Sequence, residues 1–261
     1  MKELKQIKTK NKFTKFNYKD PFLFEEQLDE SERIIRDNAK NFAHKELLPE
    51  ILLNNRNEKF DKSLFAKFGS MGFLGPQIQG YNCAGVSYVS YGLIAKEIEA
   101  IDSSYRSCLS VQSSLVMQPI FEFGNELQRK RWLPDLSSGK KVGCFGLTEP
   151  DHGSDPASMN CRAKKTKGGY LINGSKNWIS NSPIADIFLI WAKDDNSIVK
   201  GFILERDKCE GIQTPKIEGK FSLRASPTGM INLNNVFVPE ENVLEKANGL
   251  SSPMKCLTSA R

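Results

Sequence analysis

The spacing of hydrophobic and polar positions divides the chain into two parts. From Asp29 to about Pro134, apolar side chains recur at intervals of three and four residues, the period of an amphipathic helix. After Gly139 the apolar residues gather instead in short runs rich in β-branched and aromatic side chains, which is typical of strands. Because helices and strands follow one another in blocks, the pattern predicts an α+β fold and excludes a doubly wound βαβ sheet.

The helical part opens with a capping signal, since Glu32 follows Asp29 by three positions, as in a capping box. We expect this first helix to close at Pro49, a second helix to end at Gly69 and Gly72, and Ser110 to lie on a helix-like segment. Two further helices are predicted over residues 91–101 and 111–123.

The strand part contains six predicted strands. Asn173-Gly174 lies between two of them and favours a type I′ hairpin turn, because both central residues of that turn need positive φ. The predicted strands cover residues 142–147, 170–172, 176–179, 187–191, 198–204 and 230–238.

Composition narrows the class of protein. With 261 residues and 39% hydrophobic content, the chain can bury a sizeable core. The net charge of +6 is mild, and the lysine-rich leader contains no arginine, unlike an arginine-rich transit peptide or nucleic-acid arm. No apolar run reaches the roughly 20 residues of a membrane span, and the six scattered cysteines indicate neither a zinc site nor disulfides. We therefore predict no nucleic-acid partner and no membrane span.

Candidate chemistry begins where the first predicted strand ends. Residues 145–155 run into a turn rich in Gly, Pro and hydroxyl side chains, which can hold a flat ligand through its main chain, Thr148 and Ser154. Downstream, Trp178 offers an aromatic plane, and Ser180 should point to the same face of the strand. The residues alone also fit an ordinary turn and a core aromatic. Neither a G-x-G-x-x-G nor a P-loop pattern is present, so a nucleotide cofactor would need another architecture.

Two further clusters were weighed for binding. Arg106 and Ser110 are four residues apart, so on a helix they share a face and could grip one carboxylate, although an arginine there also fits a solvated surface position. Glu149, Asp151 and Asp155 match no standard calcium loop, so no metal is predicted.

Together, the segments around Arg106, Thr148 and Trp178 resemble the acyl-CoA dehydrogenases, most closely the glutaryl-CoA dehydrogenase branch, over about residues 17–261. The resemblance implies FAD as cofactor and an N-terminal all-α helical domain followed by a β-barrel-like middle domain. It implies cofactor contacts from Phe145, Gly146, Leu147, Thr148, Gly153, Ser154, Trp178, Ile179 and Ser180. It implies substrate contacts from Arg106, Ser107, Ser110 and Ser154.

The same resemblance divides the chain and predicts a missing part. We expect a basic tail at residues 1–17, the α domain at 18–138, the β domain at 139–245, and the opening of a C-terminal helical domain at 246–261. The family's catalytic glutamate belongs to that four-helix domain, so we expect the base to lie beyond Arg261, no catalytic residue in this chain, and doubtful activity of the chain alone.

The activity that the resemblance implies is oxidative decarboxylation of glutaryl-CoA to crotonyl-CoA, as in lysine and tryptophan degradation. It implies an electron-transfer flavoprotein as acceptor, a homotetramer, and a cytoplasmic place in a bacterium or the mitochondrial matrix in a eukaryote, though no transit peptide is evident. Two alternatives stay open: a short-chain or non-decarboxylating dicarboxylyl-CoA dehydrogenase, and a non-catalytic truncated remnant.

Overall fold

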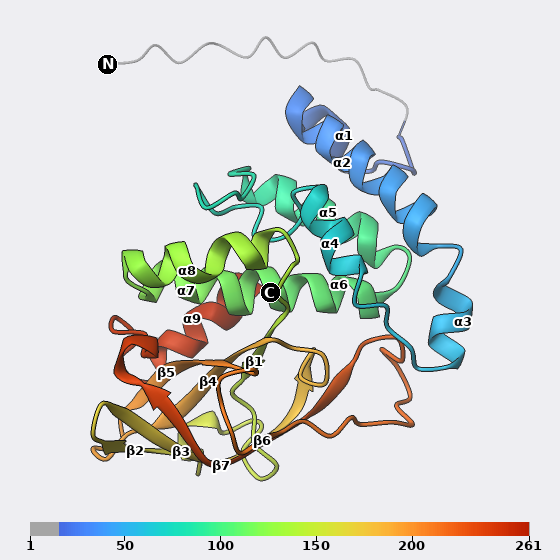
Figure 1. Ribbon diagram of the computed structural model, residues 1–261. Coiled ribbons are helices and arrows are strands. Elements are labelled where there is room, and N and C mark those ends of the chain that lie inside the picture. The colour runs from blue at the N-terminus through green and yellow to red at the C-terminus, as the bar shows by residue number, and fades with distance from the viewer. Residues whose placement is uncertain (1–15, 261) are drawn as a thin grey trace, which may run out of the picture.

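The computed structural model describes residues 16–260, so the predicted tail at residues 1–17 lies almost wholly outside the described residues. Most of the helices form one layer, and a curled mixed sheet lies against it (Figure 1). The α-helices are α1 (Phe24–Gln27), α2 (Glu30–Phe42), α3 (Ile51–Arg56), α4 (Leu64–Ser70), α5 (Tyr88–Glu99), α6 (Ser103–Ser110), α7 (Gln118–Phe123), α8 (Glu126–Ser137) and α9 (Ser251–Ala260). Shorter helical turns are η1 (Ala43–Leu47), η2 (Val111–Met117), η3 (Pro156–Ser158) and η4 (Glu240–Asn242).

The four predicted helices are all present, and one of them is longer than expected. Asp29 caps α2 with a complete capping box, in which its carboxylate accepts a hydrogen bond from the Glu32 amide at 2.8 Å. Helix α4 ends at Ser70, between the two glycines predicted to close it, and Gly72 has a φ of +71°. The predicted helix from residue 111 is longer than expected, because α6, the π-helical segment η2 and α7 form one continuous rod. Most of this rod is buried, so its apolar residues are not confined to one stripe.

The sheet contains both parallel and antiparallel pairs, and its strand β4 (Ile187–Lys193) is buried on both faces. The strands are β1 (Gly143–Gly146), β2 (Arg162–Thr166), β3 (Gly169–Ser180), β4 (Ile187–Lys193), β5 (Val199–Glu205), β6 (Ile212–Gln213) and β7 (Thr228–Pro239). Their order is β1-β4-β2-β3-β7-β6, with β5 paired to β4, and β4 runs parallel to β1 and antiparallel to β5.

Strand β4 shows how the two layers join. Ile187, Leu189 and Trp191 belong to the apolar core shared with the helices, whereas the alternating residues Phe188 and Ile190 belong to the core inside the curled sheet. Successive side chains of a strand point to opposite faces, so one continuous apolar run serves both cores. The helical layer and the sheet therefore share one apolar core.

The predicted hairpin at Asn173-Gly174 is wrong. The turn between β2 and β3 lies at Lys167-Gly168, where Gly168 has a φ of +79°, and the two strands predicted around residue 173 are the single strand β3. Asn173-Gly174 lies inside β3, where the register with β7 shifts between Ile172 and Gly174. A Cβ at Gly174 would come within 2.8 Å of the Cys161 Cα. The glycine is required here by close backbone approach at a bulge rather than by a turn.

Candidate functional site

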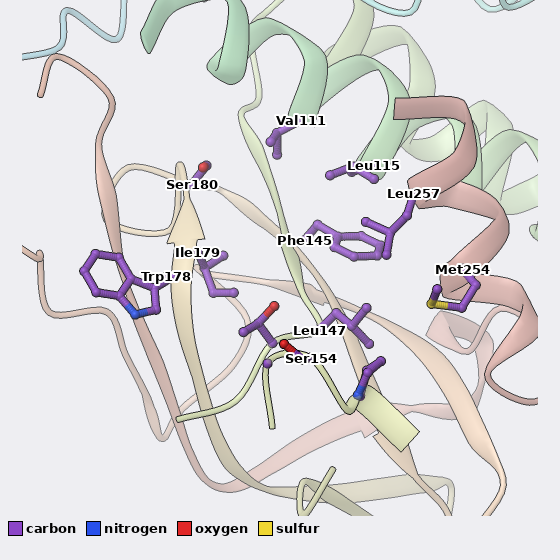
Figure 2. A pocket seen from close by; sticks show the side chains of 13 residues that line it. Val111, Leu115, Phe145, Leu147, Ser154, Trp178, Ile179, Ser180, Met254 and Leu257 are labelled. Carbon is purple, nitrogen blue, oxygen red and sulfur yellow. The ribbon is translucent and has the colours of Figure 1, made fainter. Parts of the chain in front are cut away.

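A cavity of about 380 Å³ opens where the helical rod, the sheet and α9 meet (Figure 2). Eight of the nine predicted cofactor residues line it; the exception is Gly146, whose Cβ position points at Ile190 inside the sheet. Five lining residues were not predicted, and they come from η2, η3 and α9. The whole lining is Val111, Leu115, Phe145, Leu147, Thr148, Gly153, Ser154, Pro156, Trp178, Ile179, Ser180, Met254 and Leu257.

The unpredicted residues are mostly apolar side chains that close one side of the cavity. Met254 and Leu257 extend from α9 toward Phe145, and Val111 and Leu115 reach in from the helical rod (Figure 2). The sequence signal for Met254 and Leu257 is their spacing of three residues, which places both on one face of a helix. That spacing does not tell which part of the protein the face meets.

The loop after β1 is held in place by a buried ion pair. Lys176 and Glu149 lie 2.8 Å apart, and their side chains are 0% and 4% exposed. Lys176 also donates to the Leu147 carbonyl at 3.0 Å, while the Glu149 carboxylate accepts hydrogen bonds from the Asn160 and Cys161 amides. Burial alone would raise the pKa of Glu149, but Lys176 and these hydrogen bonds outweigh it and hold the pKa below its usual value.

The sequence did not predict this ion pair, because Glu149 was grouped only with the other acidic residues of its turn. A lysine in a strand normally indicates a solvent-facing position, so nothing in the sequence marks Lys176 as buried. Because its partner stands in the turn that follows β1, the pair ties the cavity-lining loop to β3.

A second bulge in β3 sets the direction of Trp178. Lys176 pairs with Ile231 and Ile179 pairs with Gly229, so two residues of β3 stand opposite one residue of β7. Trp178 has a φ of +59°, a conformation that costs energy for a bulky residue, and its side chain is 60% exposed. It extends to one side of β3 while Ile179 extends to the other (Figure 2).

Because of the bulge, strand alternation cannot explain why Trp178 and Ser180 face the same cavity. Simple alternation along β3 predicted a shared face, but alternation is interrupted at Asn177 and Trp178. Both side chains nevertheless line the same cavity. The exposure of Trp178 also removes the alternative that it is a core aromatic.

The cavity combines an apolar wall with unengaged hydroxyls. Thr148, Ser154 and Ser180 contribute these hydroxyls, and none of the three makes a side-chain hydrogen bond within residues 16–260. A volume of this size falls within the roughly 300–1,000 Å³ range of small-molecule sites, which are mostly apolar with a few polar groups. The arrangement suits a flat, largely apolar ligand with polar edges.

The predicted carboxylate clamp is brought together but is already partly satisfied. Arg106 donates from Nη1 to Ser110 Oγ at 3.2 Å, as their helical spacing predicted, and from Nε to Glu99 at 2.6 Å. Its side chain is 35% exposed. Arg106 is therefore not an unpaired charge, because Glu99 already supplies a carboxylate. Ser107 is half-buried and accepts a hydrogen bond from Ser110 through its carbonyl at 3.2 Å.

The cysteines and acidic side chains of the described residues form neither disulfides nor a cluster suited to a metal. All six cysteines are free thiols. Among residues 16–260, no three His, Cys, Asp or Glu side chains gather as a metal site would require. Over the same residues, no helix has the length and apolar character needed to cross a membrane.

Two family descriptions match adjacent parts of the chain. Residues 29–140 match Acyl-CoA dehydrogenase, N-terminal domain. Residues 144–236 match Acyl-CoA dehydrogenase, middle domain.

Individual relatives agree with these matches. The chain is 37% identical over 218 residues to an acyl-CoA dehydrogenase of Bacillus subtilis, covering 82% of this chain and 57% of that protein. It is 30% identical over 241 residues to the mitochondrial short-chain specific acyl-CoA dehydrogenase of Mus musculus, covering 90% of this chain and 58% of that protein. The chain thus spans less than two thirds of the length of these relatives.

Solved structures give the same result for the fold. A glutaryl-CoA dehydrogenase from Mycobacterium smegmatis, solved in complex with FADH2, superposes with a TM-score of 0.89 at 41% sequence identity. The superposition covers 92% of this chain and 61% of that one.

Proposed function

Because this chain belongs to the acyl-CoA dehydrogenase family, we propose that it binds FAD in the cavity between β1, β3 and α9 and takes part in the flavin-dependent dehydrogenation of an acyl-CoA. The observation that carries the proposal is the cavity itself, where three unengaged hydroxyls and an exposed indole stand on an otherwise apolar wall. When bound, FAD supplies the two-electron acceptor for this reaction.

The residues present fit a flavin. An exposed Trp178 beside the cavity offers a plane for stacking, and aromatic stacking adds to the energy of simple burial. The hydroxyls of Thr148, Ser154 and Ser180 are available for polar ring edges. Gly153 leaves room for close approach, because a Cβ there would meet only Thr148 Cγ2 at 4.0 Å. These residues would bind the flavin ring, fix its orientation and exclude water from it.

We further propose that the substrate is glutaryl-CoA. Arg106 uses Nε for Glu99 and Nη1 for Ser110, which fixes the plane of the guanidinium and leaves Nη2 without a hydrogen bond among residues 16–260. A fixed guanidinium with a free terminal nitrogen can donate a hydrogen bond to the distal carboxylate of a dicarboxylyl thioester. The similarity to the mycobacterial glutaryl-CoA dehydrogenase supports this choice.

The general base is a separate question from binding. None of the cavity-lining residues in the described part of the chain carries a carboxylate. We therefore propose that the general base is not among these residues. The chain alone then binds and orients the flavin and the acyl-CoA but does not remove the α proton. The same proposal includes three domain ranges, residues 18–138, 139–245 and 246–261. It also includes a homotetramer and an electron-transfer flavoprotein as electron acceptor. The compartment follows the source, bacterial cytoplasm or mitochondrial matrix.

One observation favours the alternative of a short-chain acyl-CoA dehydrogenase. Glu99 already neutralises Arg106, so the site does not need a second carboxylate for charge balance. The mouse short-chain enzyme is also a relative.

A binding experiment separates the two substrates. The chain is titrated with FAD, and the loaded protein is then titrated with glutaryl-CoA and with butyryl-CoA by calorimetry. With glutaryl-CoA as ligand, Arg106→Ala should weaken binding by about 1.5–3 kcal/mol, the usual contribution of a hydrogen bond to a charged group, and should leave butyryl-CoA almost unchanged. Arg162→Ala, a change at an exposed arginine of β2, serves as the control. Equal losses for both thioesters would contradict the glutaryl-CoA assignment, and no uptake of FAD would contradict the cofactor proposal.

A further inference from the structure

Lys220 lies in a second hollow that shares a wall with the first cavity. This hollow has a volume of about 360 Å³ and is lined by Trp178, Ser180 and Lys220, together with Phe221, Ser222, Leu223 and Thr228. Trp178 and Ser180 line both spaces. Lys220 therefore lines a hollow that is separated from the first cavity by residues common to both.

The ammonium group of Lys220 is held by neutral oxygens. Its Nζ donates to the Ser226 carbonyl at 2.5 Å and to Thr228 Oγ1 at 3.1 Å. Thr228 is the cross-strand partner of Ser180 in the register of β3 and β7. Within residues 16–260 no carboxylate lies at salt-bridge distance from Lys220, and burial lowers the pKa of its amine. Lys220 is thus a half-buried cation without a paired anion.

Glu58 is an acidic residue whose charge acts on Lys220, but its hydrogen bonds and its ion pair are made with other residues. Glu58 accepts hydrogen bonds from the Gly219 amide and forms an ion pair with Arg224 at 2.7 Å. Arg224 also donates to the carbonyls of Asn55 and Lys220. These contacts fix the loop to the C-terminal end of α3, so Lys220 is held in place, and the Glu58 carboxylate acts on its charge only from beyond salt-bridge distance.

We propose that Lys220 stabilises the negative charge that a flavin in the first cavity acquires on reduction, and so raises its reduction potential. The inference rests on the proposed function. Transfer of a hydride to an oxidised flavin adds one negative charge to the ring system. A fixed cation behind the wall of Trp178 and Ser180 favours that charged product, because a partly desolvated charge is poorly screened by water.

The test is the reduction potential of the bound FAD, measured by dye equilibration. Lys220→Met and Lys220→Gln both remove the charge, and the amide of the second can keep hydrogen bonds to Ser226 and Thr228. Lys220→Arg keeps the charge, and Lys164→Met removes an equal charge from an exposed position on β2. Both neutral variants should shift the equilibrium toward oxidised flavin at least tenfold, which is about 30 mV for a two-electron couple. Lys220→Arg and Lys164→Met should keep the parent potential.

The outcomes separate this inference from the proposed function. If the parent chain takes up FAD and the neutral variants keep the parent potential, only the role of Lys220 is overturned. If both neutral variants lose FAD while Lys220→Arg retains it, the charge serves binding of the oxidised cofactor, and the inference is likewise overturned. A parent chain that takes up no FAD would remove both proposals.

Discussion

Replacing Glu149 by glutamine should destabilise the protein because it leaves Lys176 buried without a counter-charge. In the parent, the two side chains are 4% and 0% exposed and lie 2.8 Å apart. Glu149→Gln keeps the shape of the side chain, but its NH2 group must face at least one donor among the Lys176 ammonium and the Asn160 and Cys161 amides.

The size of the effect follows from burial. Breaking a buried ion pair by removing one partner costs about 3–5 kcal/mol, since the remaining charge is uncompensated. A domain is stable by only about 5–15 kcal/mol, so the variant should lose a large fraction of its stability. The double variant Glu149→Gln, Lys176→Met should recover part of the loss, because no buried charge remains.

The same pair gives a pH dependence. The pKa of Glu149 in the folded protein lies below its usual value of 4.5, because Lys176 and the amide hydrogen bonds outweigh the effect of burial. A lowered folded-state pKa contributes stability that is fully present above the unfolded-state pKa and disappears as the pH falls through the folded-state pKa. The difference between parent and Glu149→Gln should therefore be constant near neutral pH and shrink below about pH 4.5.

The assay is urea unfolding of the parent, both single variants and the double variant, followed by circular dichroism. Glu240→Gln is the matched control, because it breaks the ion pair of Lys165 and Glu240, which has the similar length of 2.7 Å but lies on the surface. This control should not move the midpoint measurably. If Glu149→Gln unfolds at the same urea concentration as the control, the buried pair does not hold the loop as argued.

Three further predictions concern the cavity and the helical layer. Trp178→Ala should lower FAD retention and alter the flavin absorption band, and a variant purified with full, spectrally unchanged FAD would refute the stacking role. Gly69→Ala should cost about 1–3 kcal/mol by overpacking, because its Cβ would come within 2.3 Å of the Ser138 carbonyl carbon, whereas Gly92→Ala in α5 meets nothing within 4 Å and should gain about 0.5–1 kcal/mol. Urea midpoints that move in the same direction for both glycines would contradict this packing. The FAD-loaded 261-residue chain should reduce no artificial acceptor with glutaryl-CoA, and sustained turnover would show that a base is present in it.

The sequence by itself determined the division into helical and strand parts, the capping box at Asp29, and the spacing that places Arg106 and Ser110 on one helix face. These features are local: each depends on residues within about one helical turn, or on a change of period along the chain. The resemblance to the acyl-CoA dehydrogenases likewise rested on short contiguous motifs, and the family matches bear it out.

Only the tertiary structure decided the roles of Gly174, Trp178 and Lys176. A bulge at Gly174 replaces the expected turn because Cys161, the residue before β2, approaches it, and the pairing with β7 forces the bulge at Trp178. Lys176 can be buried because it forms an ion pair with Glu149, and this partner lies 27 residues earlier in the sequence. The same is true of α9, which closes the cavity against β1 and the helical rod. Such contacts join residues that are far apart in the sequence, and no local pattern predicts them. They stabilise the protein only once the chain has folded.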